Sequence, residues 1–228
     1  MLPDVKLVQQ TPENDNLVLI VKDQEAVKTL FNGKEGTNAF VNSLNSDKKF
    51  VHLNTGEKSI FIVLANENDK NEALRKKGFD VFTLATKDKL SSLHIHSKLP
   101  ASLTLAFAEG LLLSGYQFLK YKTKPEAHSL NSVTIQATEL SRQAVDELLK
   151  TSSAVFAAKD LVNEPVNFLT AETLSEELIK YGKKAGFEVE VFNKTKIQSL
   201  KMGGLLSVNL GSPNPPTFNI LEYKPANA

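Results

Sequence analysis

The stretch Ser59-Ile-Phe-Ile-Val-Leu-Ala65 is a short, unbroken apolar run rich in β-branched residues, which is typical of a buried strand. A second run of this kind spans Leu17–Val21. After the first run, the polar segment Asn71–Lys77 indicates a short helix, Gly78 ends it, and Asp80-Val-Phe-Thr-Leu84 indicates another strand. A strand, a helix and a strand in succession are typical of a largely parallel sheet with helices on its faces. The predicted fold class is α/β.

Further along, the stretch from Ala101 to about Lys120 is predicted to be a helix that begins after Pro100. Its leucine and phenylalanine residues cover nearly the whole circumference, so the helix should be buried on all sides. Gly110 and Gly115 lie inside this stretch, where each costs about 1 kcal/mol relative to alanine. A close backbone contact with a neighbouring element is the expected compensation.

The next segment, Ser132–Ala137, alternates polar and apolar residues and is predicted to be a half-exposed strand. Thr138 or Ser141 can cap the long helix that follows. Asn163-Glu-Pro165 ends that helix, because the residue before a proline avoids the helical region. A helix of this length is suited to connect two domains.

The C-terminal segment is predicted to contain one more helix capped by Thr170, a strand at Phe187–Val191 and a short helix near Thr195–Leu200. Two further strands are expected at Leu205–Asn209 and Phe218–Tyr223, in a mixed sheet. The loop between them is too short for a crossover helix, so they should be antiparallel neighbours.

Composition excludes several functions. The 228 residues include 27 Lys and Arg and 26 Asp and Glu, a net charge of +1, which argues against nucleic acid as a partner. With no cysteine, neither disulfides nor thiolate chemistry can occur. No apolar run approaches the roughly 18 residues of a membrane span, and the first residues lack a signal-peptide pattern. We therefore expect a cytoplasmic protein without a membrane partner.

No complete catalytic constellation is visible. His94 and His96 lie on one side of an extended segment but lack a third metal ligand, so we interpret them as surface histidines. The adjacent carboxylates Asp146-Glu147 and Glu176-Glu177 point in different directions on their helices and should be solvated. Asn54–Lys58 is a turn signal without the glycine spacing of a phosphate loop.

Serine nucleophiles are not indicated either. The sequence contains no Gly-x-Ser-x-Gly elbow, and Ser207 and Ser212 have no histidine close to them in sequence.

A series of segments from the long helix onward resembles, in order and spacing, the entry to the catalytic domain of M17 leucyl aminopeptidases, also called cytosol aminopeptidases. The segments are Ala158-Lys-Asp-Leu-Val-Asn-Glu-Pro-Val-Asn167, Leu169-Thr170, Gly186–Val191, Lys201–Asn209, Gly211-Ser212, Pro215-Pro216 and Leu221-Glu-Tyr223.

Upstream, the segments Ala108-Glu-Gly110, Tyr116-Gln-Phe118 and Tyr121-Lys122 resemble the end of the family's N-terminal domain, whose fold is similar to macro domains. The resemblance implies a macro-like N-terminal domain with a mixed sheet at residues 1–137. A connector helix at residues 138–165 would join it to the beginning of the α/β catalytic domain at residues 166–228.

The resemblance implies a hydrolase that removes N-terminal residues, often leucine, from peptides. Two divalent ions (zinc, manganese or magnesium) would activate the attacking water, and the family is typically hexameric. The family's Asn-Thr-Asp-Ala-Glu-Gly-Arg metal-binding segment is absent from this chain, and Lys159-Asp160 belong to the connector helix. No catalytic, metal-binding or substrate-binding residue is therefore assigned, and we predict that this chain alone is inactive.

Two alternatives are a non-catalytic macro-like ligand-binding module and an assembly module. We also expect residues 165–228 to be the less stable part of the chain. The apolar residues of the two predicted C-terminal strands should be exposed there, on a sheet with an open edge that favours association.

Overall fold

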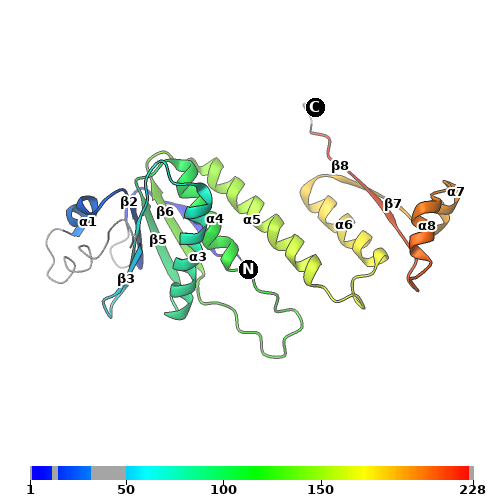
Figure 1. The fold of residues 1–228 in the computed structure, drawn as a ribbon, viewed down its shortest axis with the longest axis horizontal. Coiled ribbons are helices and arrows are strands. Elements are labelled where there is room, and N and C mark those ends of the chain that lie inside the picture. The colour runs from blue at the N-terminus through cyan, green and yellow to red at the C-terminus, as the bar shows by residue number, and fades with distance from the viewer. Residues whose placement is uncertain (1, 12–14, 32–49, 226–228) are drawn as a thin grey trace. The chain divides into compact units, whose positions relative to one another are not determined.

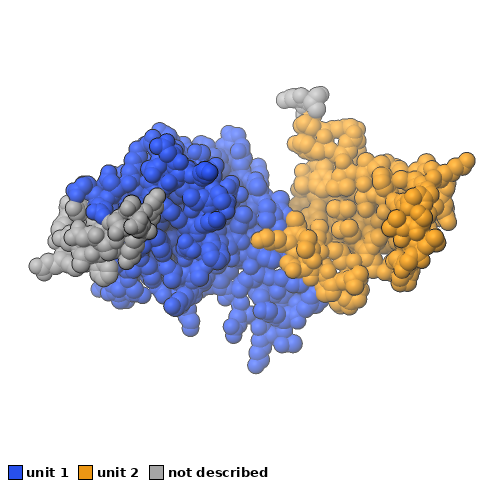
Figure 2. Space-filling model, in the orientation of Figure 1, with its two compact units in different colours: residues 1–157 blue, residues 158–228 orange. Residues whose placement is uncertain are grey.

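The computed structural model describes residues 2–11, 15–31 and 50–225 of the chain. It divides into two compact units, residues 1–157 and residues 158–228 (Figure 2), and the boundary falls within helix α5 (Arg142–Asn163). Parts of the predicted N-terminal domain, including residues 32–49, lie outside the described residues. None of the described helices is both long and apolar enough to cross a membrane.

The first unit contains a six-stranded sheet with the order β1-β6-β5-β2-β4-β3. All neighbours are parallel except β3, which pairs antiparallel with β4 through a hairpin at the predicted turn. Gly56 in that turn has a φ of 83°. The α/β fold with a mixed sheet is confirmed. The strands are β1 (Asp4–Leu7), β2 (Leu17–Val21), β3 (Phe50–Asn54), β4 (Ser59–Leu64), β5 (Ser92–Ser97) and β6 (Ser132–Ala137).

Alternation along the strands divides the sheet into two faces. Val18, Ile95 and Val133 point to a large core that also contains residues of α3 (Asn71–Lys87), α4 (Ala101–Ser114) and α5. Figure 1 shows α3 and α4 side by side over the sheet. A smaller core beneath β3 and β4 includes Val27 of α1 (Gln24–Phe31).

Two expectations for this unit are wrong. Asp80–Leu84 is not a strand, because α3 continues without a break to Lys87. The buried residues of α3 recur at three- and four-residue steps, which is a helical period, and Gly78 lies within its buried face. The helix that begins at Ala101 ends at Ser114, with Gly115 as its C-cap, and it is buried along most of its length as predicted.

The contact between α3 and α4 depends on two glycines. A Cβ atom on Gly78 would lie 2.2 Å from the Phe107 carbonyl oxygen, and one on Gly110 would lie 2.1 Å from the Arg75 carbonyl oxygen. Only glycine permits such close backbones, which confirms the close contact expected for Gly110. Beside this crossing, Arg75 Nε pairs with Glu109 at 2.8 Å.

Helix α5 and the helix that follows it begin at the residues that were predicted to cap them. Ser141 Oγ accepts a hydrogen bond from the Ala144 amide (3.1 Å) immediately before α5. Thr170 and Thr173 form a capping box at the start of α6 (Ala171–Ala185), and Gly186, with a φ of 80°, ends it. Side-chain caps of this kind satisfy amides that a helix N-terminus leaves without partners.

The second unit contains a two-stranded antiparallel sheet of β7 (Glu188–Phe192) and β8 (Phe218–Glu222). The short helix α7 (Lys194–Ser199) lies close to its predicted place. Leu205–Asn209 is not a strand but part of helix α8 (Gly203–Asn209), so β8 pairs with β7 instead. A short apolar run is compatible with either period, and here the helical one is formed.

We predict that Gly110→Ala destabilises the first unit. The added Cβ would collide with the backbone of α3. Overpacking of this kind lowers the free energy of unfolding by about 1–3 kcal/mol, which outweighs the gain of about 1 kcal/mol that alanine brings to a helix. Urea unfolding followed by circular dichroism measures the change. Gly204→Ala is the matched control, because a Cβ there meets no atom within 4 Å. A Gly110→Ala protein as stable as the unchanged protein would contradict the described contact.

Candidate functional site

A cavity of about 700 Å³ lies beyond the carboxyl ends of three neighbouring parallel strands, β1, β6 and β5. The last residues of each of these strands and the residues that follow them form its wall. Open α/β sheets bind ligands in this position, because the loops after parallel strands converge there. The lining residues are Leu7, Val8, Gln9, His96, Ser97, Lys98, Gln136, Ala137, Thr138, Leu140 and Arg142.

The side-chain amide of Gln136 joins the three strand ends. Its nitrogen donates to the Gln9 carbonyl oxygen (3.0 Å), and its oxygen accepts from Thr11 Oγ1 (2.7 Å). The same oxygen is 2.9 Å from His96 Nδ1, so this ring nitrogen must carry the proton. The wall of the cavity is thus held by hydrogen bonds between segments far apart in the sequence.

The charged lining residues are both cations. Lys98 follows the buried Ser97, whose hydroxyl lies 2.7 Å from Thr104 Oγ1 of α4 and accepts from the Leu99 amide. Arg142 is the first residue of α5, and its Nε lies 3.6 Å from Asp146 one turn later. Among the described residues that line the cavity, none is Asp or Glu. The cavity therefore has a positive electrostatic character.

The histidine pair is only partly as predicted. His94 and His96 do lie on one side of β5, but His94 is 0% exposed, so its interpretation as a surface histidine is wrong. Its Nδ1 lies 2.8 Å from Thr134 Oγ1 on the neighbouring strand. Burial lowers the pKa of His94 below its usual value, and burial likewise lowers the pKa of His128.

A serine, a histidine and an aspartate do meet in the structure, although sequence reasoning missed them. His52 Nε2 is 3.2 Å from Asp88 Oδ2 and 3.3 Å from Ser59 Oγ, and Ser59 donates to the same carboxylate at 3.2 Å. A catalytic triad needs the acid and the serine on different ring nitrogens, and a serine that substrate can reach. Here both partners share Nε2 and Ser59 is 1% exposed, so the group ties β3, β4 and α3 together.

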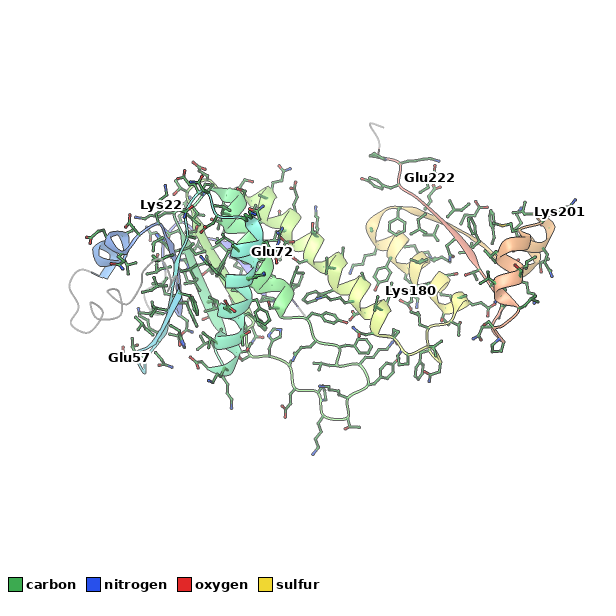
Figure 3. The ribbon with its side chains drawn as sticks, viewed as in Figure 1. Lys22, Glu57, Glu72, Lys180, Lys201 and Glu222 are labelled. Carbon is green, nitrogen blue, oxygen red and sulfur yellow. The ribbon has the colours of Figure 1, made fainter. Side chains whose placement is uncertain are left out.

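The carboxylate pairs do not form acid/base pairs with each other. Asp146 lies beside Arg142, and Glu147 accepts from Gln143 Nε2 at 2.9 Å. Glu177 pairs with Lys180, which Figure 3 labels on α6, at 2.6 Å. Asp146, Glu147 and Glu177 each face a partner on their own helix, while adjacent positions on a helix point in different directions.

No metal site can be built from the part of the chain that the structure describes. Within residues 2–11, 15–31 and 50–225, no group of three His, Asp or Glu side chains could hold a metal ion. Lys159 and Asp160 are exposed on α5, in the helical role expected of them.

The second unit exposes large apolar side chains. Val208 and Leu210 are 85% and 87% exposed, and Phe218, Ile220 and Leu221 of β8 are also exposed. Val208, Phe218, Ile220 and Leu221 belong to the group for which exposure was predicted, whereas Leu205 and Leu206 of the same group are half-buried. Isolated exposed apolar residues are normal, but several within one short segment are typical of a surface that another segment or chain covers.

Sequence comparison places the second unit in a known family. Residues 156–228 match the catalytic domain of the cytosol aminopeptidase family. Three probable cytosol aminopeptidases illustrate the similarity. Identity is 36% over 163 residues for Clostridium perfringens (67% of this chain, 31% of the relative). For a Cyanothece species it is 30% over 232 residues (97% and 45%), and for Chlorobaculum parvum 61% over 69 residues (30% and 14%). The chain thus spans less than half the length of these relatives.

Solved structures show the same fold. A mutant of tomato leucine aminopeptidase superposes with a TM-score of 0.75 at 17% identity, over 96% of this chain and 50% of that one. The bottromycin maturation enzyme BotP, solved in complex with Mn, superposes with a TM-score of 0.73 at 21% identity, over 93% and 46%. At these identities the likeness concerns the fold alone.

We predict that the first unit loses stability between about pH 7.5 and about pH 5.5, above the range in which carboxyl groups titrate. The folded state keeps His94 and His128 neutral at a pH where the unfolded chain already binds protons. The contribution is therefore present above the ordinary histidine pKa and is lost as pH falls through the lowered one. Urea unfolding at the two pH values measures the effect.

The variant His94→Asn identifies the group responsible. Its side chain can still form a hydrogen bond to Thr134 but does not titrate. The difference in unfolding free energy between the two pH values should therefore be smaller in this variant. An undiminished difference would contradict the role of His94.

Proposed function

This chain belongs to the cytosol aminopeptidase family, and on that premise we propose that it is part of a metal-dependent leucyl aminopeptidase, which hydrolyses N-terminal residues from peptides. The match of residues 156–228 to the family's catalytic domain carries the proposal. The second compact unit begins within two residues of that match, at Ala158, so sequence similarity and compactness divide the chain at nearly the same place.

The proposed domain organisation places this division inside a connector helix. Residues 1–137 would form a macro-like N-terminal domain, residues 138–165 the connector helix, and residues 166–228 the beginning of the catalytic domain. The mixed sheet of the first unit and the continuous helix α5 support this organisation.

Two divalent ions, zinc, manganese or magnesium, would activate the attacking water in the complete enzyme and stabilise the tetrahedral intermediate. The described residues do not fit such a site, since they contain no suitable group of ligands. We therefore assign the metal ligands to the part of the catalytic domain that the relatives carry beyond their alignment with this chain. The Mn in the structure of BotP, which shares this fold, supports the proposal of a divalent ion.

The proposed setting is cytosolic, as the name of the curated relatives suggests, with peptides as substrates and a homo-oligomer, by family resemblance a hexamer, as the assembly. Membranes and nucleic acid are not among the proposed partners. The cavity of the first unit favours a second candidate function, a macro-like ligand-binding module that accompanies the enzyme.

We predict that the 228-residue chain alone does not hydrolyse leucine p-nitroanilide with added Mn²⁺ or Zn²⁺. A water molecule needs a bound metal to lower its pKa to about 7, and the described residues supply no ligand set. The product of the whole encoding reading frame is the comparison, and its turnover should disappear with a chelator. Chelator-sensitive turnover by the short chain would overturn the assignment of the metal ligands. A long product without turnover would overturn the proposed activity.

A second prediction concerns association through the exposed apolar side chains of residues 158–228. Light scattering should show an apparent mass that rises with protein concentration, because burying apolar surface between copies is favourable. Val208→Ser with Leu210→Ser should reduce this association. Phe79→Ser, which replaces an exposed apolar residue of the first unit, is the matched control and should leave it unchanged. A strictly monomeric protein would contradict the prediction.

A further inference from the structure

We infer that the cavity beyond the carboxyl ends of β1, β6 and β5 binds a small amphipathic anion, an organic phosphate or carboxylate, through Lys98 and Arg142. This function goes beyond peptide hydrolysis and lies within the first compact unit, outside the residues matched by the catalytic domain.

The size and the apolar part of the cavity define the body of the ligand. Pockets for small molecules are commonly about 300–1,000 Å³, and this cavity, at about 700 Å³, lies within that range. Leu7, Val8 and Leu140 supply apolar lining. An inorganic ion would leave most of this space and all of this surface unused, so the ligand should carry an apolar group.

The charges define the head of the ligand. Lys98 lies in the loop after β5 and Arg142 is the first residue of α5, and the described lining has no carboxylate to neutralise them. Arg142 has Asp146 as a neighbour at 3.6 Å, with both side chains at least half exposed, and an exposed ion pair of this length holds its arginine weakly. The guanidinium can therefore turn to an anion, which it binds in a planar, two-pronged manner.

The frame around these cations is already ordered. Gln136 holds the wall through Gln9, Thr11 and His96, and Ser97 fixes the backbone next to Lys98 through Thr104. A preformed wall lowers the entropy that binding would otherwise lose, so even a small anion can bind measurably. The two cationic side chains are exposed and lie outside this frame.

The experiment titrates the ¹⁵N-labelled full chain with phenyl phosphate, with benzoate and with neutral benzyl alcohol, and follows the amide resonances by NMR. Shifts should appear at residues 97–99 and 137–142. The tighter of the two anions identifies the preferred head group. Benzyl alcohol should bind about tenfold more weakly than that anion, and added salt should weaken the binding of the anion, because the attraction is electrostatic.

The double variant Lys98→Gln/Arg142→Gln should weaken binding of the preferred anion by about tenfold or more. Both replaced side chains are exposed, and unchanged resonances elsewhere would show that the variant is folded. Lys87→Gln, which removes an exposed cation at the end of α3, is the matched control and should bind as the unchanged protein does. Absence of shifts with both anions, equal affinity in the double variant, or shifts confined to residues 158–228 would overturn the inference.

Discussion

The backbone contact between α3 and α4 at Gly78 and Gly110 is the constraint on which the first unit depends. Because neither residue carries a Cβ atom, the two helices lie against each other closely enough to cover one face of the sheet together. The position of α4 in turn places Thr104 against Ser97, and that hydrogen bond fixes the loop from which Lys98 extends. The close packing of α3 against α4 thus helps to determine the geometry of the sheet edge where the cavity lies.

Sequence reasoning worked where a local cause determines the structure. The buried runs of β2 and β4, the alternating β6 and the Thr170 cap were predictable because β-branched runs, alternation and caps act over a few residues. Asp80–Leu84 and Leu205–Asn209 were not, since short apolar runs are compatible with both strand and helix. In α3 the buried residues on both sides of Gly78 follow one helical period, and the close contact of Gly78 with α4 shows why a glycine inside this helix does not end it.

The candidate site was beyond prediction for a related reason. Gln136 meets Gln9 and Thr11 across sequence separations of 127 and 125 residues, and only the pairing of β1 with β6 brings them together. The group of His52, Ser59 and Asp88 was missed in the same way, because a hairpin and a helix end must first be placed. Family resemblance was visible earlier because the motifs that carry it are contiguous segments.

The role of Gln136 has a consequence for how the cavity can change over evolutionary time. The hydrogen bonds of its amide form a frame, while the side chains of Lys98, in the loop after β5, and Arg142, at the start of α5, lie outside that network. Substitutions at these two positions would alter what the cavity prefers without disturbing the sheet. Substitution of Gln136 would remove the hydrogen bonds that join the three strand ends, and it would change which nitrogen of His96 carries the proton. The ligand preference of the cavity can therefore change among proteins that share this fold, while the sheet and its hydrogen bonds are kept.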